Sequence, residues 1–89
     1  MIKSSINISN KLGLHARASA KLSRLAGSFP CEVWIARAER RVNAKSIMGV
    51  MMLAAGIGAT LEIDTDGERE QEAMDALLAL ISDKFGEGE

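Results

Sequence analysis

The sequence predicts an α+β fold in which helices cover one face of an antiparallel β-sheet, and three observations support this. The chain has 89 residues, a length typical of one domain. Four segments alternate apolar and polar residues, as strands with one buried face do. Other segments carry apolar residues at helical spacing. We therefore expect a single domain over residues 1–89, an open-faced β-sandwich of order βαββαβα, with four strands and three helices.

The first half of the chain is expected to contain three strands and one helix. Alternation over residues 2–8 predicts the first strand. Good helix formers over residues 16–26 predict a helix, and Gly27 is typical of the position just past a helix. Alternation then predicts strands over residues 31–35 and 40–43, joined by a turn without Gly or Asn.

The second half is expected to contain two helices around one strand. Residues 46–53 predict a short helix, because Ser46 is a strong N-cap and methionine favours helices. Alternation over residues 61–66 predicts the fourth strand. An apolar stripe over residues 74–85 predicts the last helix, and residues 86–89 are expected to fray.

Composition excludes several classes of protein. No apolar run approaches the roughly 20 residues that span a bilayer, and the first residues lack a signal-peptide pattern, so we expect a cytoplasmic protein without membrane insertion. The net charge is −1, with most basic residues in the first half and most acidic residues in the second. This is compatible with a basic patch for an anion or an acidic partner. An acidic total without a basic and aromatic stripe argues against nucleic-acid binding.

Counting residues excludes most site chemistry. One His and one Cys cannot form a structural zinc site, and a single Cys forms no internal disulfide, so Cys31 is expected to be a small buried residue. No Gly-rich phosphate loop followed by Lys-Ser or Lys-Thr is present. The chain is too small to enclose a hydrolase pocket. We expect no metal and no cofactor, and the remaining candidate is His15.

His15 directly precedes the first predicted helix. The first N–H groups of a helix lack internal partners and carry about half a positive charge, so an anion on the imidazole would be stabilised there. Arg17 adds a permanently charged, forked donor. A neutral imidazole is nucleophilic, and we expect no acidic partner that would favour the charged ring near His15. These features suit a histidine that accepts and releases a phosphoryl group; a helix cap or a packing role is the alternative.

Residues 13–19 and 42–53 resemble the two motifs of the HPr family, the histidine-containing phosphocarriers of the bacterial phosphoenolpyruvate-dependent phosphotransferase system. The motif separation, chain length and element order also fit. The resemblance implies that enzyme I phosphorylates His15 on Nδ1 and that His15 passes the group to a histidine of an enzyme IIA domain. It further implies that Ala16 and Arg17 bind the phosphate, without a metal. The protein would be a monomeric, stoichiometric carrier and not a stand-alone catalyst.

Ser46 resembles the regulatory serine that HPr kinase/phosphorylase modifies in some bacteria. A capping role is expected whether or not Ser46 is modified. A phosphate there would add about −1.5 to −2 charges at a helix N-terminus, which tolerates them. Phosphorylation would then disturb docking of a partner more than folding.

An exposed apolar patch beside His15 is expected to dock the partner proteins. Val50 and Leu53 suit the core side of the short helix, which leaves other apolar residues facing outward. Methionine adapts to several partners. The alternative is that Met48, Met51 and Met52 all lie in the core. The expected docking residues are Ala20, Arg24, Ile47, Met48 and Met51.

Three departures from the family pattern leave the pathway open. Leu12, Ala18 and Met52 stand where the family often has Ser or Thr, Pro, and a small polar residue. Leu12 and Ala18 resemble proteobacterial forms, including the nitrogen-related branch NPr, whereas residues 45–49 resemble the serine-regulated type. The alternative function is a regulatory protein-binding module without sugar transport, either NPr-like and nitrogen-related or with a kinase or transcription factor as its partner. A third hypothesis is a ferredoxin-like sensor of small ligands, but no pocket motif supports it.

Overall fold

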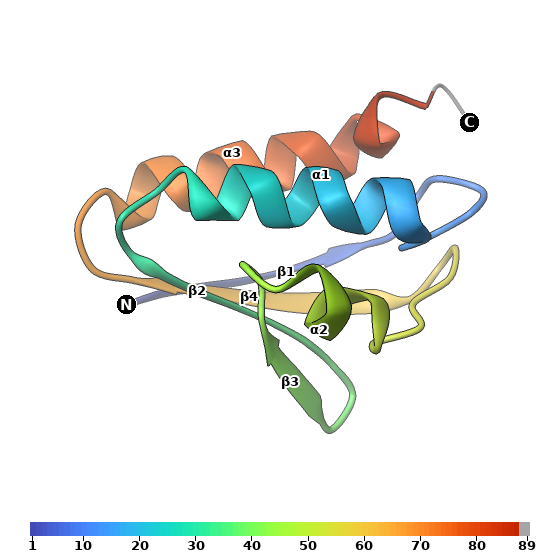
Figure 1. Cartoon of the computed structure of the whole chain (residues 1–89), viewed down its shortest axis with the longest axis horizontal. Coiled ribbons are helices and arrows are strands. Elements are labelled where there is room, and N and C mark those ends of the chain that lie inside the picture. Colours follow the sequence, from blue (N-terminus) through green and yellow to red (C-terminus); the bar gives the residue numbers. More distant parts are fainter. Residues whose placement is uncertain (88–89) are drawn as a thin grey trace.

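The computed structural model describes residues 1–87 and confirms the predicted class and element order (Figure 1). The strands are β1 (Ile2–Asn7), β2 (Glu32–Arg37), β3 (Arg40–Asn43) and β4 (Thr60–Asp66). The helices are α1 (Ala16–Gly27), α2 (Ile47–Met51), α3 (Glu70–Ser82) and the 3₁₀ turn η1 (Lys84–Gly86). The strands form one antiparallel sheet in the order β1-β4-β2-β3. In Figure 1, α1 and α3 lie side by side above this sheet, and α2 packs against α1.

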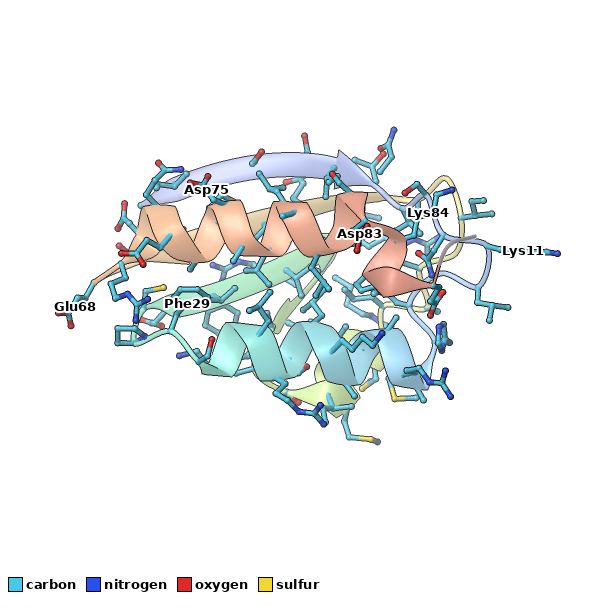
Figure 2. The ribbon with its side chains drawn as sticks, turned by 90° about the horizontal axis from the view of Figure 1, so that it is seen from above. Lys11, Phe29, Glu68, Asp75, Asp83 and Lys84 are labelled. Atoms are coloured by element: carbon cyan, nitrogen blue, oxygen red, sulfur yellow. The ribbon has the colours of Figure 1, made fainter. Side chains whose placement is uncertain are left out.

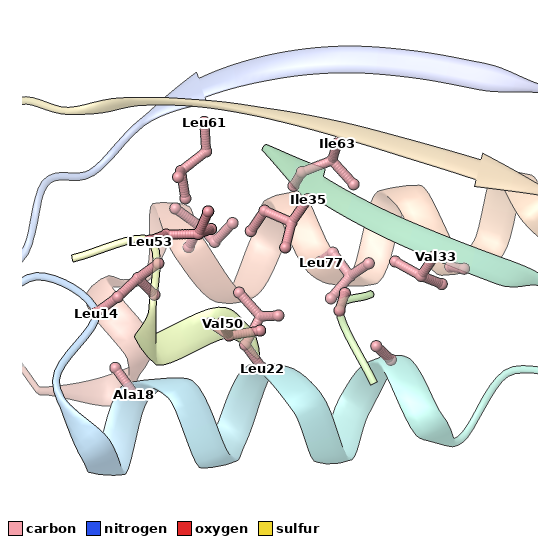
Figure 3. Packing of buried hydrophobic residues seen from close by; sticks show 14 of the residues in the cluster. Leu14, Ala18, Leu22, Val33, Ile35, Val50, Leu53, Leu61, Ile63 and Leu77 are labelled. Carbon is pink, nitrogen blue, oxygen red and sulfur yellow. The ribbon is translucent and has the colours of Figure 1, made fainter. Parts of the chain in front are cut away.

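The period-two pattern of the strands decides which face of the sheet is buried. Leu61 and Ile63 of β4 are buried, whereas Glu62 between them is exposed. In β2, Ile35 packs in the same cluster, together with Leu77 of α3 (Figure 3). Each such side chain contributes about 1.5–3 kcal/mol when it leaves water. The core therefore lies between the sheet and the helices, and the other sheet face is open to solvent.

The short helix α2 depends on its cap and on two buried residues. Ser46 Oγ accepts the N–H of Gly49 at 3.1 Å, which confirms the predicted N-cap. Val50 and Leu53 are buried in the common core, and α2 packs against α1. A five-residue helix is unstable in isolation, so these contacts hold α2 in place.

The loop before α1 is anchored on the segment that follows α2. Gly13 has a φ of +64°, and a Cβ there would lie 2.7 Å from Gly56 Cα. Only glycine accommodates both the conformation and the close approach. The next residue, Leu14, donates its N–H to the carbonyl of Ala55 at 2.8 Å. The chain therefore enters α1 in a fixed orientation.

The structure corrects the predicted end of the chain. The helix ends at Ser82, and Lys84 and Phe85 adopt left-handed conformations in η1, so Phe85 enters the core from a turn and not from α3. The predicted fraying is wrong for Glu87, which contacts the body of the protein, and residues 88–89 lie outside the described residues. Cys31 is buried as expected. Over residues 1–87, no helix has the length and apolar character needed to cross a bilayer.

Candidate functional site

His15 is the N-cap of α1, as its place before the predicted helix indicated. Its backbone is extended, with φ −74° and ψ 178°, and its carbonyl accepts the N–H of Ser19 at 2.9 Å. The ring turns back over the helix end, where Nδ1 accepts the N–H of Arg17 at 3.3 Å. The side chain is 27% exposed. The imidazole therefore lies at the positive end of α1 and remains accessible from solvent.

A shallow surface hollow opens beside this ring. No acidic residue occupies the first turn of α1, so the free N–H groups at this helix end are not neutralised from within the helix. The hollow carries three basic side chains and one carboxylate, and it is open, so a second protein could reach the ring. Its lining residues are Lys11, Leu12, His15, Ala16, Arg17, Lys21, Gly86 and Glu87.

The carboxylate in the hollow belongs to Glu87, and the sequence did not predict it there. Glu87 Oε2 contacts His15 Nε2, and Oε1 accepts a hydrogen bond from Asn10 Nδ2 at 3.0 Å. The Asn10 amide, and then the His15 ring, hold the pKa of Glu87 below its ordinary value. The expectation that no acidic group lies beside His15 is wrong, because the two residues are 72 positions apart.

The segment that carries Glu87 is fixed against α1. Lys21 Nζ donates to the carbonyl of Phe85 at 2.6 Å, and the Phe85 ring is fully buried. The N–H of Glu87 donates to the carbonyl of Lys84 at 3.0 Å. In Figure 2, Lys84 and Lys11 lie at the same end of the molecule, opposite Glu68 and Phe29. The end of the described chain thus completes the His15 site.

The predicted docking residues of α2 are exposed. Met48 is 71% and Met51 is 39% exposed, while Ile47 and Met52 are also open to solvent. The alternative that the methionines fill the core is therefore wrong. Ala20 on α1 is half-buried and Arg24 is exposed. The loop residues Leu12 and Ile57 are also exposed, and this was not predicted, because loop residues carry no periodic pattern.

Ser46 lies at the surface at the start of α2. Its Oγ accepts the N–H of Gly49, and no acidic residue occupies the first turn. The Nζ of its neighbour Lys45 donates a hydrogen bond to the carbonyl of Phe29 at 2.9 Å. Ser46 is thus accessible while it caps the helix.

The described part of the chain offers no group of three or more His, Cys, Asp or Glu side chains arranged to hold a metal ion. The hollow at the start of α1 holds the imidazole of His15, the basic side chains around it and the carboxylate of Glu87.

Comparison with known proteins assigns the chain to a family. The family profile described as "PTS HPr component phosphorylation site" matches residues 2–83. The phosphocarrier protein HPr of Cupriavidus necator is 66% identical over 89 residues, which cover 100% of both chains. The phosphocarrier protein NPr of Shewanella violacea is 43% identical, covering 92% of this chain and 90% of that protein.

A solved structure gives the same assignment. The crystal structure of HPr-C-His from Thermoanaerobacter tengcongensis superposes with a TM-score of 0.94 and 42% identity, covering 98% of both chains. The superposition covers nearly the whole of both chains. The chain therefore belongs to the HPr family, the phosphocarrier proteins of the phosphotransferase system.

Proposed function

We propose that His15 is the residue through which this phosphocarrier works. It accepts a phosphoryl group from a phosphohistidine of enzyme I, which is charged by phosphoenolpyruvate, and passes the group to a histidine of an enzyme IIA domain. The observation that carries this assignment is the half-buried but accessible His15 ring at the N-terminus of α1, beside Arg17. Histidine is also a nucleophile that forms a phosphoryl bond and readily releases it, and it lines the hollow.

The geometry suggests how the phosphoryl group is held. Nδ1 of His15 attacks phosphorus while the nitrogen–phosphorus bond of the donor breaks in line. The 3.3 Å hydrogen bond from the Arg17 N–H to Nδ1 is long, so this donor can turn to a phosphate oxygen once Nδ1 is occupied. The N–H of Ala16 and the guanidinium of Arg17 supply further donors at the positive helix end.

Docking is proposed to use the exposed face of α2 together with the outer side of α1. Transfer between two histidine rings requires that the partner surfaces align before phosphorus moves. An exposed apolar patch on α2, which packs against the helix that bears His15, supplies such a surface. The proposed docking residues are Ala20, Arg24, Ile47, Met48 and Met51.

Ser46 is proposed as a regulatory phosphorylation site for an HPr kinase/phosphorylase. Its exposed position at the edge of the docking surface supports this, because a phosphate there adds negative charge beside Ile47 and Met48. The positive end of α2 tolerates that charge, so docking would be lost while the fold remains. Incubation with ATP and the kinase tests this, and equal labelling of S46A and the wild type would remove the proposal.

We also propose that residues 1–89 act as one domain and as a monomer, since the hydrophobic core closes within a single chain. The test of the central assignment is incubation with enzyme I and labelled phosphoenolpyruvate. The wild type is expected to take up about one phosphate that is labile in acid and stable in base, whereas H15A takes up none. Equal labelling of a folded H15A variant would contradict the proposal.

A further inference from the structure

We infer that Glu87 is a positioning residue for phosphoryl transfer, because its carboxylate holds the proton on Nε2 of His15 and leaves the lone pair of Nδ1 for phosphorus. This inference rests on the proposed role of His15. The Arg17 N–H donates to Nδ1, so that nitrogen carries the lone pair. In a neutral imidazole the other nitrogen then carries the hydrogen, and Nε2 faces the carboxylate. Two independent contacts thus select the same tautomer.

Glu87 is held in place by groups that do not react. Asn10 is 0% exposed, and its Nδ2 donates both to Glu87 Oε1 at 3.0 Å and to the carbonyl of Gly13 at 2.9 Å. The Lys21 contact with the Phe85 carbonyl fixes the preceding backbone. The Glu87 side chain is only 16% exposed. The carboxylate therefore remains beside the ring before a partner docks.

A carboxylate at this position favours both halves of the transfer. When the bond between Nδ1 and phosphorus forms, the donor's nitrogen–phosphorus bond breaks and the ring becomes a positively charged phosphoimidazolium. Its Nε2 proton stays in place, and the Glu87 carboxylate stabilises the new charge. When the group leaves, the electron pair of the phosphorus bond returns to Nδ1 and the ring is neutral again. No proton has to enter or leave the site.

Three variants separate the orientation of the ring from the effect of charge. E87Q keeps an acceptor oxygen beside Nε2 but removes the charge, whereas E87A removes both. E68Q is the matched control, since Glu68 lies at the opposite end of the molecule (Figure 2). The ring nitrogens of His15 are followed by ¹⁵N NMR at neutral pH. Transfer from phosphorylated enzyme I is followed by rapid quench, and amide spectra check each fold.

The expected NMR result is a ring protonated on Nε2 in the wild type, E87Q and E68Q, and a mixture of tautomers in E87A. We expect transfer to slow roughly tenfold in E87Q and further, to about 100-fold, in E87A, as for loss of a charge-assisted hydrogen bond. E68Q should transfer at the wild-type rate.

Two results would overturn the inference and leave His15 as the carrier. One is an E87A variant that labels on His15 at the wild-type rate with the wild-type tautomer. The other is a wild-type phosphate bonded to Nε2, the nitrogen that faces Glu87, identified by its coupling between ³¹P and ¹⁵N. A wild type that takes no label on His15 would instead remove the proposed function, and the inference with it.

Discussion

The N-termini of α1 and α3 present the same physical feature and use it in opposite ways. Both helices point unpaired N–H groups and a partial positive charge away from their first turn. Helix α1 has His15 as its cap and no acidic residue in its first turn. Helix α3 has Glu70 and Glu72 there. The sequence thus neutralises one helix end and leaves the other open to an external anion.

The contacts at α3 show how fully its end is occupied. Glu70 accepts the N–H of Gly67 at 3.0 Å and pairs with the Met1 amino group at 3.2 Å, while Glu72 pairs with Arg69 at 2.9 Å. A positive helix end therefore does not by itself make an anion site. The end becomes available when the first turn of the helix holds no carboxylate of its own, as in α1.

The largest expected effect concerns the loop that positions α1. G13A should destabilise the protein by about 2–4 kcal/mol, because a side chain there is strained at φ +64° and collides with the backbone near Gly56. Urea unfolding measures the change. The matched control is G56A, where an added Cβ meets no atom within 4 Å. Equal free energies of unfolding for the two variants would show that the entry to α1 is not fixed as described.

The next effect concerns the basic side chain at the open helix end. R17A should slow phosphoryl transfer from enzyme I by about 10- to 100-fold, which corresponds to one lost charge-assisted hydrogen bond. The transfer rate of R17K should lie between those of R17A and the wild type, since lysine keeps the positive charge but lacks the forked guanidinium group. R69A, at the entry to α3, serves as control and should transfer normally. An R17A variant as fast as R69A would refute the role of Arg17.

A smaller effect is expected at the docking surface. M48D should weaken binding to enzyme I by about tenfold while the protein stays folded, because Met48 is exposed and a charge there opposes apolar contact. Titration calorimetry measures the affinity. A79D places the same charge on an exposed position of α3 and should bind normally. Unchanged affinity of M48D would move the docking surface away from α2.

The smallest effect concerns the occupied end of α3. The Gly67 N–H, and then the Met1 amino group, hold the pKa of Glu70 below its ordinary value. Ionised Glu70 therefore stabilises the fold above its unfolded pKa, and this stabilisation is lost as pH falls through the lower folded pKa. E70Q should lower Tm slightly at pH 7, and the difference should shrink as the pH falls below the ordinary glutamate pKa of about 4.3 and vanish below the folded pKa of Glu70. A Tm difference between E70Q and the wild type that grows in acid would contradict these contacts. The rate of phosphoryl transfer should not change in E70Q.

The sequence predicts the elements and the caps of this protein because these depend on near neighbours. Period-two and helical patterns place β1, β4 and α1, while Ser46 and His15 cap helices through groups two or three residues away. The apolar stripe of α3 misplaced Phe85, since hydrophobicity marks burial and not the left-handed turn that delivers it.

The half of the site that sequence could not predict comes from distant residues. Glu87 reaches His15 across 72 positions, and Lys21 reaches Phe85 across 64. No local pattern encodes such pairs, because they arise only when η1 folds back against α1. The positions of His15 and Arg17 at the helix end were therefore predictable, and the carboxylate beside the His15 ring was not.

The central claim is that the open end of α1 receives a phosphoryl group on His15. The most direct test is the amide spectrum of ¹⁵N-labelled protein before and after phosphorylation by enzyme I and phosphoenolpyruvate. The largest shifts should occur at the N–H groups of Ala16 and Arg17, while those of Gln71 and Glu72 at α3 stay unchanged. Phosphorylation that leaves Ala16 and Arg17 unmoved, or that moves the α3 amides equally, would contradict the claim.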